Sequence, residues 1–346
     1  MIMMDVKTGL FVKNDFYTGI SVLRAVLCYW VIIIHCVDIK INHIKYFTRH
    51  FHVPTFFLLS FYFYYPSVYN RNILKIKMRF QRLLYAYISW PFLIFVFNNI
   101  LVMSSRFNTF FTYYTLKDLY IQFLIGARCY NHFWFHFNLM FISLFFTIIS
   151  FTAKKKLLII VEFIGIISLY FHFSGLNFYI FYNLKYPTNK TLGTLNELIP
   201  MAVFGCIFSS INLLLKLQNL NISFIFMFCF LLYLIFKYNI FFGPPGFLYP
   251  NILLNILAST ILFVLFGSIN IHKFQIINKL IKYITSFTGG IYYIHLIFPK
   301  YLYYIFNLDR SKTSYFFAFI IYIICFIICL FGYKLFKNSK FKYLFI

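Results

Sequence analysis

Hydrophobic runs of about 20 residues recur along almost the whole chain, and they limit what it can fold into more than any other feature. A run of that length forms a helix that crosses the hydrocarbon core of a bilayer. Of the 346 residues, 62% are hydrophobic and 11% are charged, whereas an ordinary soluble domain has about 25% charged residues. The sequence therefore predicts an all-α, polytopic membrane protein that forms one integral membrane domain over residues 1–346.

Taking each apolar run of about 17–25 residues as one span predicts ten transmembrane helices. The short inner segments then hold 18 of the 31 Lys and Arg residues, so the positive-inside rule favours cytoplasmic N- and C-termini. The basic residues that give the net charge of +24 lie in short blocks between the hydrophobic runs. This distribution is typical of membrane topology, so no nucleic-acid partner is expected. The predicted spans are 19–39, 51–69, 83–103, 132–152, 157–173, 198–215, 220–237, 252–270, 284–305 and 314–333.

The first span carries an arginine and a histidine, Arg24 and His35, with ten residues between them. Eleven helical steps place them roughly 16 Å apart along the axis and within about 20° of the same face. Charged groups inside a membrane usually face the protein interior or a watery cavity, so this helix is predicted to form one wall of a functional cavity. Asp38 lies three residues later and could hold the imidazole in one tautomer. The alternative is that Arg24 extends to the cytoplasmic surface and that His35 only hydrogen-bonds a neighbouring helix.

A second basic feature, Arg79 and Arg82 in the stretch MRFQR, stands at the cytoplasmic entry to the third span. Arginines three residues apart share a helical face, and their planar guanidinium groups suit phosphate. A basic pair at this place also fits a topology determinant that attracts anionic lipid head groups.

Two further histidine-containing stretches are candidates for the cavity wall. The run HFWFHFNLM places His132, Trp134 and His136 at the start of the fourth span. The i, i+4 histidines lack an accompanying carboxylate or thiolate, so no metal site is predicted. The run SFTGGIYYIH combines small residues for close helix approach with His295, which is either a core residue or part of the cavity.

Taken in order, these stretches resemble the acyltransferase-3 family of integral membrane acyltransferases over nearly the whole chain. The matching pieces are LRAVLCYWVIIIH, HVPTFFLLSFYF, MRFQR and FTGGIYYIH, together with HFWFHFNLM and the ten-span layout. The resemblance implies transfer of an acyl group, usually acetyl, from a cytoplasmic acyl-CoA to a glycan hydroxyl. It implies that His35 is catalytic and that Arg24, Arg79 and Arg82 belong to donor binding or to the same functional core.

The chain also departs from the family pattern. Many members have Ser-Gly-Phe in the second span, where this chain has Ser60-Phe61-Tyr62, so the cavity is expected to be narrower there. Some members carry an extracytoplasmic hydrolase-like domain, and none is expected here.

The resemblance thus implies an O-acyltransferase, in particular an O-acetyltransferase, of the bacterial cytoplasmic (inner) membrane. The expected donor is acetyl-CoA or another acyl-CoA, the expected acceptor is a surface polysaccharide or a lipid-linked sugar, and membrane lipids are expected to surround the protein. His35 acts as a general base or accepts the acyl group itself, and the sequence leaves both routes open. The candidate substrate-cavity residues are Ser60, His132, Trp134 and His295. The alternatives are a glycan-precursor transporter or flippase and a purely structural membrane component.

Overall fold

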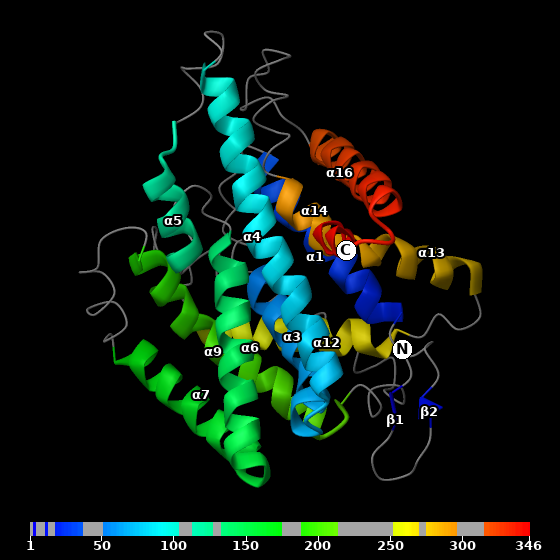
Figure 1. Cartoon of the computed structure of the whole chain (residues 1–346). Coiled ribbons are helices and arrows are strands. Elements are labelled where there is room, and N and C mark those ends of the chain that lie inside the picture. Colours follow the sequence, from blue (N-terminus) through cyan, green and yellow to red (C-terminus); the bar gives the residue numbers. More distant parts are fainter. Residues whose placement is uncertain are drawn as a thin grey trace. The chain divides into compact units, whose positions relative to one another are not determined.

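A computed structural model describes residues 3–4, 11–12, 18–36, 51–103, 113–126, 133–174, 188–213, 252–269, 275–295 and 315–346. Within these ranges the protein is helical, apart from a short antiparallel pair of strands, β1 (Met3–Met4) and β2 (Phe11–Val12) (Figure 1). The α-helices are α1 (Thr18–Cys36), α3 (His52–Tyr69), α4 (Ile73–Met103), α5 (Leu116–Ile125), α6 (Trp134–Ala153), α7 (Leu157–Phe173), α9 (Thr188–Ser210), α12 (Ile252–Ser268), α13 (Gln275–Ser286), α14 (Thr288–Ile294) and α16 (Tyr315–Leu335).

The predicted all-α membrane fold agrees with these helices. Helices lie in all the predicted spans except 220–237, which falls outside the described residues. Four helical stretches are long and apolar enough to cross a membrane: Thr18–Cys36, Ile73–Ile100, Trp134–His172 and Tyr315–Leu335. The third of them contains α6 and α7, which the turn η3 (Lys154–Lys156) separates. The total of ten spans and the cytoplasmic termini stay predictions.

Some helices differ from the predicted ranges for local reasons. The helix α4 begins at Ile73, ten residues before the predicted span, because the side chain of Asn72 accepts a hydrogen bond from the backbone N–H of Lys75 (3.0 Å) and caps it. The length of apolar runs does not predict the short helix α5, because it has only ten residues. It is fixed by a capping box between Thr115 and Asp118 and by Gly126 in the left-handed conformation.

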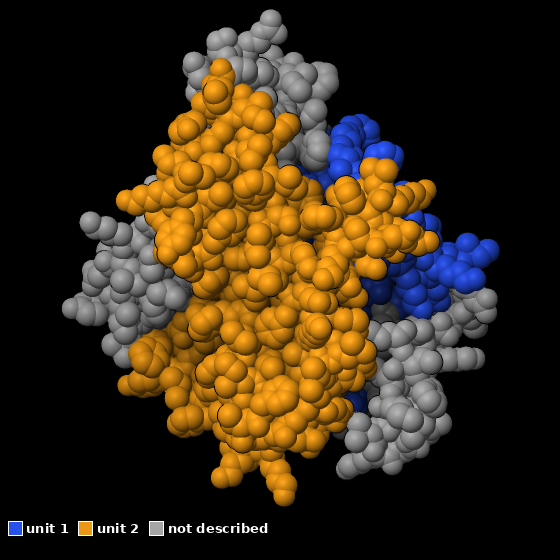
Figure 2. Space-filling model, viewed as in Figure 1, with its two compact units in different colours: residues 1–56, 212–331, 346 blue, residues 57–211, 332–345 orange. Residues whose placement is uncertain are grey.

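Two compact units make up the chain (Figure 2). The first unit comprises residues 1–56, 212–331 and 346, and the second comprises residues 57–211 and 332–345. The prediction of a single domain stays a prediction.

In the first unit, α1 packs against α12, α13 and α14. Gly19 permits the contact with α12, because a Cβ atom at this position would collide with the carbonyl oxygen of Phe266. The core of this unit includes fully buried residues of α1, among them Leu23, Leu27 and Ile32.

In the second unit, α6 packs against α4, α7 and α9, and α7 packs closely along α9. The C-terminal 3-10 helix η5 (Lys340–Leu344) lies against α4, where the indole Nε1 of Trp90 donates a hydrogen bond to the carbonyl oxygen of Leu344 (3.0 Å). This contact joins the end of the chain to the helix that carries Arg79 and Arg82.

Candidate functional site

The helix α1 lies beside α14 (Figure 1), and both Arg24 and His35 contact the stretch that contains α14. The Nη2 atom of Arg24 donates a hydrogen bond to Oγ1 of Thr288 (3.1 Å). One helical turn later, the thiol of Cys28 donates to the backbone carbonyl of Thr288 (3.6 Å). Thr288 therefore holds α1 by both its side chain and its backbone.

Further along α1, His35 lies beside His295, with the ring centroids 5.3 Å apart and the ring planes inclined by 43°. The contacts of Arg24 and His35 follow the same order along both helices, so α1 and α14 run parallel. The two sequence stretches that carry Arg24, His35 and His295 are thus neighbours in the fold.

The orientation of His295 is fixed by the backbone just before it. The side chain is fully buried, and its Nδ1 donates a hydrogen bond to the carbonyl oxygen of Tyr292 (2.6 Å). Because a carbonyl oxygen only accepts hydrogen bonds, the proton of the neutral ring lies on Nδ1 and the lone pair on Nε2. The ring of Tyr292 lies 5.6 Å from that of His295 and completes an aromatic wall.

A break between α13 and α14 sets the start of this segment. Phe287 occupies the break, is almost fully buried and makes edge contacts with the rings of Tyr283 and Phe326. The hydroxyl of Thr288 donates to the carbonyl oxygen of Thr285 (3.0 Å), so it bridges α13 and the guanidinium group of Arg24. The packing of Phe287 therefore positions the residue that holds Arg24.

In the second unit, Arg79 points into the interior. Its Nη2 donates to the hydroxyl of Ser60 (2.8 Å), and its Nε and Nη2 donate to the hydroxyl of Ser143 (3.1 and 3.0 Å). Its guanidinium carbon lies 4.2 Å from the ring centroid of Tyr64. All these partners are neutral, and among the described residues no carboxylate pairs with Arg79. No carboxylate among the described residues therefore compensates the charge of this guanidinium group, which lies beside the predicted cavity residue Ser60.

Arg82 has different surroundings from Arg79. Its side chain is exposed, and its guanidinium carbon lies 5.8 Å from the ring centroid of Tyr343 in η5. A three-residue step turns the helix by about 300°, and the remaining difference of about 60° directs the two side chains to different neighbours. The RxxR pair does not form one paired guanidinium surface in this structure.

The other predicted site residues are placed as follows. Trp134 opens α6, is buried and makes an edge contact with the ring of Phe135 (6.3 Å). Asp38 and His132 lie outside the described residues. Among the side chains that the structure describes, no group of three or more His, Cys, Asp or Glu residues could hold a metal ion.

Sequence reasoning missed Thr288, Ser143 and Glu197. Nothing in the sequence distinguishes Thr288 and Ser143 from other helix residues. Their role appears only in the structure, where their hydroxyl groups accept hydrogen bonds from Arg24 and Arg79. Glu197 offered a signal, a carboxylate beside an apolar run, but the predicted span began at residue 198. In the structure α9 begins at Thr188, so Glu197 lies inside the helix, and its Oε2 atom is buried and has no hydrogen-bond partner within the described ranges.

These groups support two kinds of chemistry. A pair of imidazoles can move a proton or accept an acyl group, and an arginine without a carboxylate partner can bind an anion such as phosphate. The first unit holds the imidazole pair with Arg24, and the second unit holds Arg79.

The comparisons with known proteins give one family match. The family model described as "Acyltransferase domain" (acyltransferase-3) matches residues 17–340, nearly the whole chain. The comparisons with curated proteins and with solved structures find no match.

Proposed function

The chain belongs to the acyltransferase-3 family and is a membrane acyltransferase; from this premise we propose that it is an O-acetyltransferase. The proposed donor is a cytoplasmic acetyl-CoA. The proposed acceptor is a hydroxyl group of a surface polysaccharide or of a lipid-linked sugar, and the proposed location is the bacterial cytoplasmic membrane. Family membership gives no support to the alternative of a transporter or flippase.

The observation that carries the proposal is the joint packing of Arg24 and His35 against Thr288 and His295. Two sequence stretches separated by more than 250 residues bring an arginine and two histidines to one helix pair, where Arg24 donates a hydrogen bond to Thr288 and the ring of His35 lies beside that of His295. Ionisable residues inside membrane helices are rare and usually mark a substrate path. We therefore assign the chemical step to the first unit.

His35 has two available roles. In the direct route it takes the proton of the acceptor hydroxyl while the oxygen attacks the thioester carbonyl; the C–S bond then breaks, and the leaving thiolate receives the proton from the imidazolium. In the two-step route the imidazole nitrogen attacks the carbonyl, the C–S bond breaks, and the thiolate leaves with the imidazole proton as the free thiol; the acceptor oxygen then attacks the acyl-imidazole, the N–C bond breaks, and the hydroxyl proton returns to the imidazole. Asp38, by its place three residues after His35, remains the proposed partner that orients the ring.

The residues proposed for donor binding are Arg24, Arg79 and Arg82. Arg24 is held by Thr288, and Arg79 is held by hydroxyl groups that leave its charge uncompensated. Both features suit the phosphates of a coenzyme A donor, because guanidinium groups form strong, charge-assisted hydrogen bonds with phosphate. The side chain of Arg82 is exposed. Ser60, His132, Trp134 and His295 are the proposed lining of the substrate cavity.

The test uses membranes that contain the wild-type protein or a variant, supplied with acetyl-labelled acetyl-CoA, and measures label in the glycan fraction. His35→Ala is expected to abolish labelling while the protein still inserts. The matched control is His172→Ala, which removes a histidine of α7 that has no proposed role, and it should leave labelling unchanged. Wild-type labelling in the His35 variant would refute the catalytic assignment, and glycan translocation without acetylation would favour a transporter.

A further inference from the structure

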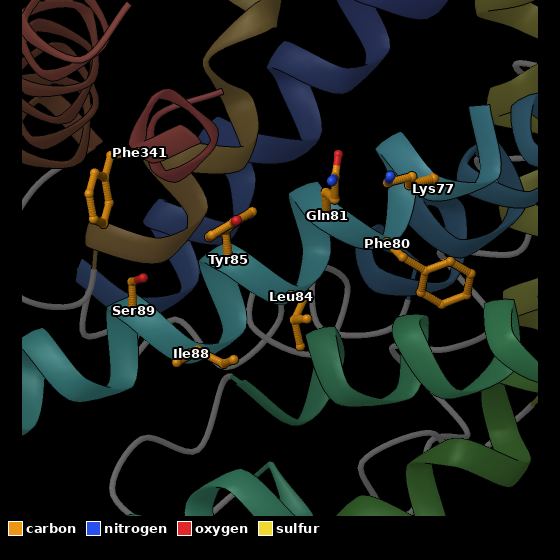
Figure 3. Close-up of a pocket in the computed structure, with 8 residues that line it drawn as sticks. All are labelled: Lys77, Phe80, Gln81, Leu84, Tyr85, Ile88, Ser89 and Phe341. Atoms are coloured by element: carbon orange, nitrogen blue, oxygen red, sulfur yellow. The ribbon is translucent and has the colours of Figure 1, made fainter. Parts of the chain in front are cut away.

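A groove runs along α4 in the second unit, on the side where η5 lies (Figure 3). It has a volume of about 440 Å³. Its lining comes from α4 and from Phe341 of η5, two parts of the chain that are more than 250 residues apart. The lining residues of α4 are Lys77, Phe80, Gln81, Leu84, Tyr85, Ile88 and Ser89.

The α4 residues of the groove form two parallel rows. Lys77, Gln81, Tyr85 and Ser89 follow one another at intervals of four residues, so they make a polar row along the helix. The second row, also at intervals of four, is apolar and consists of Phe80, Leu84 and Ile88. In Figure 3 Lys77 lies at one end of the groove and Ser89 lies toward the other, next to Phe341.

The groove has the length and the environment of a lipid site. From Lys77 to Ser89 the helix rises about 18 Å, close to the hydrocarbon depth of one leaflet, about 15 Å. The stretch Ile73–Ile100 is apolar enough to cross a membrane. Leu84 and Ile88 are 45% and 47% exposed, so their apolar faces need a hydrocarbon neighbour.

The Lys77 end of the groove is basic. Segment 70–82, which contains Lys77, has no Asp or Glu. In the part of the chain that the structure describes, no carboxylate pairs with Lys77 or Arg82. Besides Lys77, this segment carries the positive charges Arg71, Lys75, Arg79 and Arg82, of which Arg79 points into the interior.

From this juxtaposition we propose that the groove binds one anionic glycerophospholipid. The ammonium group of Lys77 pairs with the lipid phosphate, and Gln81 and Tyr85 are placed to hydrogen-bond the glycerol ester region. One acyl chain lies along Phe80, Leu84 and Ile88 and against Phe341. The bound lipid thereby bridges α4 and η5, beside the contact between Trp90 and Leu344.

The charge at one end and the apolar row together select this ligand. A soluble phosphate compound would leave the exposed leucine and isoleucine uncovered, and a zwitterionic lipid would add a second positive charge near Lys77. The proposal concerns a surface distant in sequence from the proposed catalytic residue His35 and needs no acyl transfer. Its test is therefore independent of the proposed function.

The test measures lipid retention by the purified, delipidated full chain in a nonionic detergent. The protein is titrated with palmitoyl-oleoyl phosphatidylglycerol or with the phosphatidylcholine of the same chains, and bound lipid is counted by native mass spectrometry. We expect one phosphatidylglycerol per chain and no retained phosphatidylcholine. Lys77→Ala should weaken phosphatidylglycerol binding roughly fivefold, the effect of one basic residue at an anionic lipid, and Lys77→Arg should preserve it.

Two further variants separate the parts of the proposed site. Lys155→Ala removes an exposed lysine of η3 outside the groove and should leave binding unchanged. Leu84→Trp fills the apolar row and should abolish retention while Lys77 is intact. Equal retention of both lipids, wild-type binding by Lys77→Ala or Leu84→Trp, an equal loss in Lys155→Ala, or displacement by equimolar glycerol 3-phosphate would each overturn the proposal.

Discussion

The substitution Thr288→Val tests whether the contact between α1 and α14 serves the reaction. The Thr288 hydroxyl accepts a hydrogen bond from Nη2 of Arg24 (3.1 Å) and donates one to the carbonyl oxygen of Thr285 (3.0 Å). Valine has nearly the same shape but no hydroxyl, so it removes one hydrogen bond from a charged donor in a partly buried place. Such a bond contributes about 1.5–3 kcal/mol. If the bond holds Arg24 in its working position, the transfer rate should fall about 12- to 160-fold.

The assay is the initial rate of label transfer from acetyl-CoA to glycan in membrane vesicles, normalised to the amount of inserted protein. Thr288→Ser keeps the hydroxyl and should stay within about twofold of wild type. The matched control is Thr285→Val, one turn earlier in the same segment. The Thr285 hydroxyl donates only to backbone carbonyls of its own helix, those of Ile281 (2.9 Å) and Lys282 (3.2 Å), so its loss should leave the rate unchanged.

Thermal unfolding of each purified variant, followed in the same detergent, separates loss of fold from loss of positioning. A wild-type rate for Thr288→Val would refute the reasoning, because the hydrogen bond to Arg24 would then have no part in transfer. An equal loss of rate in Thr285→Val would do the same, since it would trace the effect to the stability of α13 and α14.

Three other outcomes follow from contacts in the second unit. Arg79→Lys keeps the charge but loses the planar donor pair, so the KM for acyl-CoA should rise about tenfold with a smaller change in kcat; unchanged steady-state kinetics would contradict donor binding. Gly205→Ala places a Cβ atom 2.9 Å from the backbone nitrogen of Tyr62 and should lower the free energy of unfolding by about 1–3 kcal/mol, read from detergent unfolding curves. Glu197→Gln replaces with a neutral amide a carboxylate whose Oε2 atom is buried and has no hydrogen-bond partner among the described residues, so the Tm should rise; the control Glu162→Gln should leave the Tm unchanged, and a lower Tm in Glu197→Gln would show a structural carboxylate.

The sequence alone determined the positions of several long apolar helices and the shared helical face of Arg24 and His35. An apolar run long enough to cross a bilayer forms a helix because a helix makes its backbone hydrogen bonds within the segment itself, where hydrocarbon offers no partners. The length of the runs therefore predicts α1, α3, α6 and α7 to within a few residues. The helical period places Arg24 and His35 on one face of α1, because the face on which a residue lies depends only on spacing within a single helix. Short or polar helices such as α5 and α13 were missed because their signals are caps and amphipathic faces.

The tertiary structure decided which partners those residues meet. Thr288 and His295 lie far along the chain from Arg24 and His35, and nothing local in either stretch specifies their pairing. The same holds for Arg79, whose serine partners come from α3 and α6. Hydrophobicity and period are properties of one segment and can be read from it, whereas a contact between segments depends on how two packed surfaces fit, which the order of residues along the chain does not display.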